Sequence, residues 1–262
     1  DDQLTHPPLE CVFTVMEEIG LEGALHMAPE QILSRRIISL DGGSETSTMC
    51  CAAGGIKGYV QQSLKKTAAI YAHGLHITID GLAGGHSGIA IHQGHANAIC
   101  LGQRFLYRLE TASIPFELCS FQGGTADNSI PQRCDIAVNT DHPEALQHIL
   151  EQFSKDIASE FCDRDAAISM RVERIPADAS AFSSACMRNL LDLICMIPDG
   201  VSAFHIPLHI PSASNNIGLL TQKEDHLELW FRIRGLLNSM MDELLCKIKT
   251  AASYTDGDVH VI

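Results

Sequence analysis

The feature that most constrains the fold is an order of predicted elements that occurs twice after about residue 75. His76–Asp80 alternates between apolar and polar residues, as a half-exposed strand does. The set that follows is a helix, two strands, a helix and a strand, at 92–109, 116–122, 133–139, 142–160 and 167–174. The second set has the same order, at 181–196, 215–222, 226–233, 238–253 and 258–262. Because the order recurs and the residues do not, we predict a duplicated two-layer α+β unit with halves at about 73–175 and 176–262.

The chain before this unit has a different pattern. Leu9–Val15 and residues 36–40 are short, nearly continuous apolar runs, which predict strands buried on both faces of an α/β sheet. Residues 20–27 between them predict a short helix or turn. We therefore expect part of an α/β domain at 1–72 and the duplicated α+β domain at 73–262.

Charge and composition exclude several classes of partner. The formal net charge is −14 and no cluster of Lys and Arg occurs, which argues against binding to nucleic acid. No apolar run is long enough to cross a bilayer, so we expect no membrane partner. The ten cysteines are scattered and form no CxxC pair, as is typical of reduced thiols in a cytoplasmic protein.

Three carboxylates follow the two predicted strands of the first region. Glu17 and Glu18 come after the first run and Asp41 after the second. Ligand sites in open α/β sheets gather beyond the carboxyl ends of strands. One of two adjacent carboxylates can bind a metal while its neighbour acts as general base towards the metal-bound water, and Asp41 would then serve a second metal. The alternative is an acidic strand end that faces water and a loop-capping Asp.

Three candidates for substrate contact lie in the second region. His86 sits among the glycines of Gly84–Gly88, where an exposed imidazole could donate to a developing oxyanion or to a substrate carboxylate. Asn128 lies in the loop Gly123–Pro131, which taken alone is an ordinary turn. Arg234 ends a predicted strand, where its guanidinium could bind a carboxylate in bidentate fashion or simply be solvated.

Several motifs resemble a known family when they are taken in order. They are His6–Glu10, Thr14–Gly20, Leu40-Asp41, Ala53–Gly55, Gly81–Gly88, Gly123–Thr125 with Asn128–Pro131, Ser214–Gly218, and Ile233-Arg234. In this order they resemble the aminoacyl-histidine (Xaa-His) dipeptidases, relatives of carnosinase within the two-zinc aminopeptidase superfamily. The resemblance covers nearly the whole chain.

The resemblance implies a function and a role for each candidate. It makes residues 1 to about 72 the middle of a catalytic α/β domain and residues 73–262 an enlarged lid that can mediate a homodimer. The implied reaction is hydrolysis of dipeptides of the Xaa-His type at a two-zinc site. Glu17 would be the general base, Glu18 a ligand to one zinc and Asp41 a ligand to the other. The substrate-binding residues would be His86, Asn128, Arg234 and Asn216.

The sequence also departs from the family pattern. The early His-x-Asp ligand pair, the metal-bridging Asp and the last His ligand of the family have no counterpart among these residues. Zinc in such sites takes about four ligands per ion, so we expect this chain to be incomplete and inactive alone. Two alternatives therefore stand beside the enzyme: a non-catalytic dimerisation or interaction module of lid type, and a degenerate pseudo-enzyme.

Overall fold

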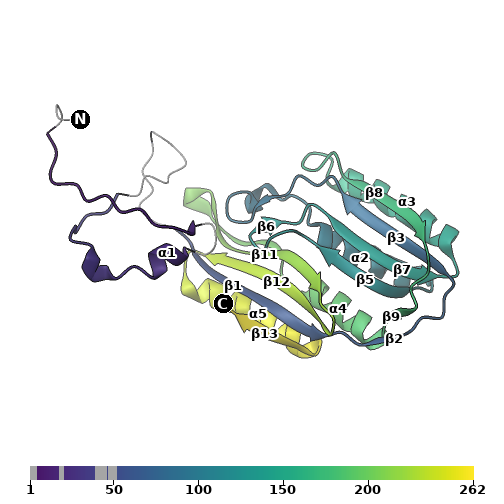
Figure 1. The fold of residues 1–262 in the computed structure, drawn as a ribbon. Helices are drawn as coiled ribbons and strands as arrows, with labels where there is room; N and C mark the ends of the chain where they lie inside the picture. Colours follow the sequence, from purple (N-terminus) through teal and green to yellow (C-terminus); the bar gives the residue numbers. More distant parts are fainter. Residues whose placement is uncertain (1–4, 18–20, 39–45, 47–51) are drawn as a thin grey trace. The chain divides into compact units, whose positions relative to one another are not determined.

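A computed structural model describes residues 5–17, 21–38, 46 and 52–262 of the chain, which divides into two compact units, Asp1–Cys51 and Ala52–Ile262 (Figure 1). The described part of the first unit contains the short helix α1 (Glu22–Leu25) and a 3-10 turn at Pro29–Gln31. The short helix or turn predicted at 20–27 is therefore confirmed for the described residues 21–27. None of the described helices is both long and apolar enough to span a membrane.

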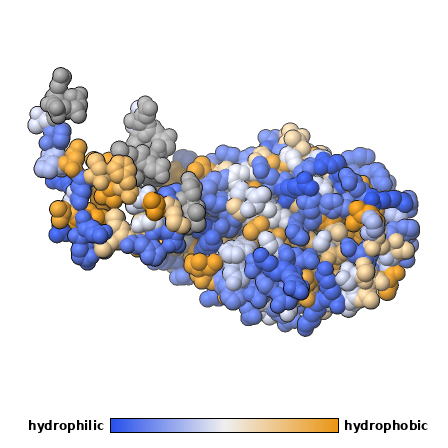
Figure 2. All heavy atoms as spheres, in the orientation of Figure 1, coloured by the Kyte–Doolittle hydropathy of each residue, from blue (hydrophilic) through white to orange (hydrophobic). Residues whose placement is uncertain are grey.

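The strand predicted at Leu9–Val15 is wrong. These residues form no strand and are exposed, with Phe13 92% exposed, and apolar side chains are visible on the surface of this unit in Figure 2. The second predicted strand fails likewise at 36–38, while residues 39 and 40 lie outside the described part. A continuous apolar run becomes a strand only where neighbouring strands and covering layers bury it, and the described residues of this unit supply neither.

The second unit is built on one large antiparallel sheet. Its strand order is β13-β1-β12-β11-β5-β7-β3-β8, with β10 paired to β11. The helices α2, α3, α4 and α5 cover one face of the sheet (Figure 1). In chain order the elements are β1 (Gly54–Ser63), β3 (His73–Asp80), α2 (Ala98–Thr111), β5 (Glu117–Gly123), β7 (Cys134–Thr140), α3 (Pro143–Glu160), β8 (Ser169–Ile175), α4 (Ser184–Met196), β10 (Gly200–His205), β11 (Ile210–Gln222), β12 (His226–Gly235), α5 (Asn238–Tyr254) and β13 (Gly257–Val261). The strands β2 (Lys66–Ala68) and β9 (Ser180–Phe182) form a separate two-stranded sheet.

The sheet consists of two halves with the same topology, as the repeated pattern predicted. The first half runs β3-α2-β5-β7-α3-β8 along the chain and has the sheet order β5-β7-β3-β8. The second half has the corresponding order β11-β12-β1-β13. Its first strand is β1, which precedes the whole first half in sequence. The compact unit therefore begins at Ala52, earlier than the expected boundary near residue 72.

The alternation of buried and partly buried residues along β12 shows which of them face the helices. Leu227, Leu229, Phe231 and Ile233 are buried in the core, whereas the residues between them are only partly buried. Successive side chains of a strand point to opposite faces, so Arg232 and Arg234 lie on the face that the helices leave uncovered. The pattern of this one strand thus places the candidate arginine on the open side of the sheet.

Asp199 links the two halves of the second unit through hydrogen bonds. Its carboxylate accepts a hydrogen bond from the Ile217 backbone N–H of β11 at 2.7 Å and from the side-chain amide of Asn97 at 3.2 Å. Asn97 also caps the N-terminus of α2, in the other half. Although Asp199 has exposed surface, its carboxylate is turned inward, and this burial raises its pKa to about 6 against the opposing effect of its hydrogen bonds.

We expect Asp199 to make the second unit less stable as the pH rises from about 4 to about 6. A raised pKa means that the folded protein holds the proton more tightly than the unfolded chain, so stability falls as this proton is lost. Asp199→Asn removes the titration. Urea unfolding followed by fluorescence of Trp230, the single tryptophan, gives the free energy of unfolding of both proteins at each pH. The difference between them should change below pH 6 and stay constant above it; a constant difference throughout would contradict the assignment.

Candidate functional site

His86 and Asn128 lie on two loops that pair with each other. The short strands β4 (Gly85–His86) and β6 (Ser129–Ile130) form a two-stranded ladder in which His86 faces Ser129. The Ser87 N–H then donates to the Asn128 carbonyl oxygen at 2.8 Å. Gly84 has a φ of 65° and Gly85 has a φ of 126°. Residues other than glycine rarely adopt these backbone conformations. The glycine-rich motif thus makes the turn that brings the His86 loop against the Asn128 loop.

Arg234 reaches the same place from β12. A Cβ atom built on Gly88 would stand 2.9 Å from the Arg234 Cζ atom and 3.2 Å from the His86 Cε1 atom. The guanidinium and the imidazole therefore lie close together around a glycine that leaves room for both. Two residues predicted from distant parts of the sequence, His86 and Arg234, are brought together in the fold.

The positive charges around Arg234 are not equivalent. Arg232 lies 2.6 Å from the Asp127 carboxylate, and Lys57 on β1 lies 3.3 Å from the same carboxylate. Arg234 forms no ion pair with any residue in the described ranges, and its half-buried guanidinium has a buried Nε without a partner there. Burial, followed by the charge of Arg232, lowers the pKa of Arg234, but an arginine remains charged in proteins. One cation of the cluster is thus available for an external anion.

His86 is a neutral hydrogen-bond donor at physiological pH. Burial, followed by the charges of Arg234 and Arg232, lowers its pKa below the ordinary value of 6.5. The Gly88 N–H donates to the His86 Nδ1 atom at 3.2 Å, so the neutral ring carries its proton on Nε2. The exposed imidazole can therefore donate from Nε2 to an oxygen placed between it and Arg234.

Asn216 supports the Asn128 loop from below. It is 1% exposed, and its side-chain amide donates to the Asp127 carbonyl at 3.2 Å and to the Ser129 carbonyl at 2.9 Å. These two carbonyls flank Asn128, whose own side chain makes no hydrogen bond within the described part of the chain. Asn216 therefore holds the loop in place, and Asn128 is the amide of the two that is left for a ligand.

The candidate catalytic and metal-binding residues belong to the first unit. Glu17 is described and exposed, whereas Glu18 and Asp41 lie outside the described residues. Among the residues that are described, no three His, Cys, Asp or Glu side chains come together as a metal site requires. We therefore derive no step of a reaction through a metal ion from this geometry.

Asp127, Arg232 and Lys57 belong to the site but were not predicted from the sequence. Signals in the sequence could have found the first two of them. Arg232 is two residues before Arg234 and so shares its face of β12, and Asp127 directly precedes Asn128. Lys57 could not be found, because the strand that carries it was not predicted.

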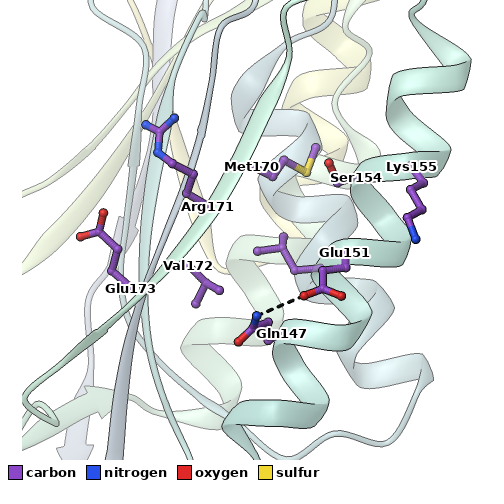
Figure 3. Close-up of a pocket in the computed structure, with 9 residues that line it drawn as sticks. Gln147, Glu151, Ser154, Lys155, Met170, Arg171, Val172 and Glu173 are labelled. Carbon is purple, nitrogen blue, oxygen red and sulfur yellow. Dashed lines mark hydrogen bonds between the residues drawn. The ribbon is translucent and has the colours of Figure 1, made fainter.

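A cavity of about 600 Å³ lies elsewhere, between α3 and the edge strand β8 (Figure 3). Met170 and Val172 point towards α3, while Arg171 and Glu173 point away from it. The residues of α3 that line the cavity are Gln147, Leu150, Glu151, Ser154 and Lys155. None of the residues that line this cavity belongs to the His86–Arg234 site. The cavity therefore has no part in the chemistry described above, although it is large.

Comparisons with known proteins agree with this architecture. Residues 77–163 match the model of a peptidase dimerisation domain. The chain is 27% identical over 246 residues to the cytosol non-specific dipeptidase of Escherichia coli strain K12. The alignment covers 92% of this chain and 50% of that protein. The chain is similar to this dipeptidase over most of its own length. Its resemblance to the dipeptidase family, predicted from the motifs, is thereby confirmed.

The fold is that of a solved dipeptidase. The crystal structure of aminoacylhistidine dipeptidase from Vibrio alginolyticus superposes with a TM-score of 0.83 at 24% identity, covering 95% of this chain and 51% of the other. The predicted fold class, a mixed α/β chain with a duplicated two-layer α+β unit, is confirmed by the large antiparallel sheet and by this structural match. The chain spans about half the length of the relatives it matches.

Proposed function

We propose that this chain is the lid-bearing part of a metal-dependent dipeptidase that hydrolyses small peptides with a free C-terminus, of the Xaa-His type. The observation that supports the proposal most is the meeting of His86 and Arg234 beside the Asn128 loop, with the charge of Arg234 left unpaired in the described structure. The names of the two relatives, a non-specific dipeptidase and an aminoacylhistidine dipeptidase, support this class of substrate.

Each residue of the cluster has a distinct task in this proposal. The guanidinium of Arg234 binds the C-terminal carboxylate of the peptide, because charge-assisted hydrogen bonds between arginine and a carboxylate are strong. His86 donates its Nε2 proton to the oxygen that becomes negative as the peptide bond is attacked. The Asn128 amide binds the peptide backbone, and Asp127 neutralises Arg232 so that it does not compete for the carboxylate.

The hydrolytic step is assigned to the first unit. Glu17 would act as general base, with Glu18 and Asp41 as ligands to a pair of zinc ions. Zinc in such a site would lower the pKa of a bound water and polarise the peptide carbonyl. The name of the Escherichia coli relative also supports a cytoplasmic location, and the family match at 77–163 supports a homodimer formed through the lid.

A second candidate is a non-catalytic dimerisation module, which the match to a peptidase dimerisation domain favours. The two differ in what the His86–Arg234 cluster should do. A module that only mediates association has no reason to bind a peptide carboxylate there. Binding of a small carboxylate probe therefore separates them.

We expect N-acetyl-L-histidine to bind the 262-residue chain and Arg234→Ala to weaken this binding by about 10–100-fold, because a hydrogen bond to a charged group is typically worth about 1.5–3 kcal/mol. The bound carboxylate should also raise the pKa of His86, since it adds a negative charge beside the ring. Titration followed by NMR of the His86 ring measures both. The control is Arg188→Ala, which removes an arginine that pairs with Glu110 on the helices at 2.8 Å. Equal affinity of Arg234→Ala and the unmodified protein would refute the carboxylate site.

A further inference from the structure

A buried carboxylate behind the His86 loop is not used by the proposed chemistry. Asp165 follows α3 and is 3% exposed, with its side chain fully buried. Its Oδ1 atom accepts a hydrogen bond from the Ala83 N–H at 2.7 Å, and its Oδ2 atom accepts one from the Ala96 N–H at 2.8 Å. The His95 Nδ1 atom lies 3.4 Å from Oδ2. Three segments of the chain, around Ala83, Ala96 and Asp165, therefore meet at one carboxylate.

Burial of a carboxylate is costly unless hydrogen bonds compensate it, and here both oxygens are used by backbone N–H groups of irregular segments. One of those segments leads to His86 and the other leads to the helix α2. Ala83 precedes His86 by three residues, and Ala96 directly precedes Asn97, the capping residue of α2. Asp165 thus ties the His86 loop to the start of α2 and to the end of α3, both of which belong to the packed core.

The other backbone hydrogen bonds around His86 are made to the Asn128 loop or within the His86 loop itself. Gly81, Gly84 and Gly85 all have positive φ values, and the ladder between β4 and β6 is two residues long on each side. Besides the Asp165 bond, the Ala83 peptide is held by Gln132, whose side-chain amide donates to the Ala83 carbonyl at 2.8 Å. A glycine-rich loop loses more conformational freedom on ordering than other sequences, so each anchor matters to where its histidine stands.

We infer that Asp165 is a positioning residue for the site: by holding the Ala83 N–H it fixes the His86 imidazole against Arg234, in the place that the proposed function requires. The inference rests on that function for its purpose but not for its geometry. A displacement of about 1 Å at a catalytic group can cost about 100-fold in rate, so an anchor of this kind matters to activity without touching substrate.

The test is Asp165→Asn in the 262-residue chain, measured first without ligand. Asparagine keeps the shape of the side chain but offers one acceptor oxygen, so one of the two backbone N–H groups loses its partner. We expect the pKa of His86, followed by NMR, to rise towards its ordinary value, because the ring moves away from the burial and the arginines that lower it. The control is Glu117→Gln, which alters a carboxylate that accepts from the Ile70 and Tyr71 N–H groups of another loop. An unchanged His86 pKa in Asp165→Asn would overturn the inference.

A double-mutant cycle separates positioning from a general loss of structure. Asp165→Asn should weaken binding of N-acetyl-L-histidine about 10-fold when His86 is present and leave it unchanged in a His86→Ala background, since coupled residues are not additive. Equal weakening in both backgrounds means that Asp165 is merely structural and overturns the inference. If Arg234→Ala and His86→Ala leave binding unaffected, the proposed function fails while the His86 pKa still tests Asp165. If Asp165→Asn does not fold, amide exchange of the unmodified protein decides: Ala83 and Ala96 should be equally protected, and an unprotected Ala83 would overturn the anchor.

Discussion

Replacing Gly124 by alanine is expected to destabilise the second unit by about 2–6 kcal/mol, the sum of a strained backbone and an overpacked contact. Gly124 follows β5 and has a φ of 78°. A Cβ atom there would stand 2.0 Å from the carbonyl oxygen of Gly218, on β11. The obstructing atom belongs to the backbone of a central strand, so it cannot move aside as a flexible side chain would. The contact lies where the two halves of the sheet meet, because β5 and β11 pair at Gly123 and Leu220.

A matched variant separates the two causes. Gly200 also has a positive φ, 92°, but a Cβ atom at this position would meet nothing within 4 Å. Gly200→Ala should therefore cost only the backbone strain, about 1–2 kcal/mol. Urea unfolding followed by Trp230 fluorescence gives both free energies of unfolding. Equal losses of unfolding free energy in the two variants would show that the close approach of Gly124 to Gly218 adds no cost beyond the backbone strain.

The elements with a clear hydrophobic period were predictable within a few residues. The helix predicted at 142–160 is α3 (Pro143–Glu160), and the strand predicted at 226–233 is β12 (His226–Gly235). Both bury one face against the core, so the period of their apolar residues reports the structure directly. The repeated order of elements likewise predicted the duplication, since each half forms its own packed layer of helices on strands.

β1 could not be predicted because its glycines interrupt the alternating pattern that is typical of a strand. Gly54, Gly55 and Gly58 lie in its ten residues, and glycine weakens any strand pattern. Yet the fold requires Gly58, since a Cβ atom there would lie 2.6 Å from the Phe231 ring. The strand exists because β12 and β13 pair with it on either side, which is a tertiary cause and leaves no local signal.

For the site, the sequence indicated residues but not their arrangement. His86, Asn128 and Arg234 stood out by their motifs, and the fold places them on paired loops and a neighbouring strand. The support of the Asn128 loop by Asn216 and the pairing of Arg232 with Asp127 depend on the register of β11 and β12, which includes a bulge between Ile217 and Leu219. Register of this kind is set by packing between distant strands, so one sequence alone does not reveal it.

In a form of the protein that binds its metal and turns over dipeptide, Glu17→Gln is expected to lower kcat by about 10²–10⁴-fold while zinc stays bound. The amide keeps the shape of the side chain but cannot accept a proton from the attacking water. Glu18→Gln should instead weaken zinc binding, because it removes a charged ligand from the metal. Steady-state kinetics with a Xaa-His dipeptide, together with zinc analysis of each purified variant, distinguish the two neighbours.

His86→Ala completes the comparison, since the task proposed for His86 is on the substrate and not on the metal. Removing one donor to a developing oxyanion typically lowers kcat by about 10²–10³-fold, so we expect a loss of that size with zinc retained. Its pH profile should differ from that of Glu17→Gln, because the neutral His86 ring donates at physiological pH and needs no charge change to act. Loss of zinc in Glu17→Gln with retention in Glu18→Gln would mean that the two glutamates have the opposite roles. If neither substitution changes turnover or zinc content, the acidic pair lies outside the catalytic centre, and the proposed reaction must be assigned to other residues.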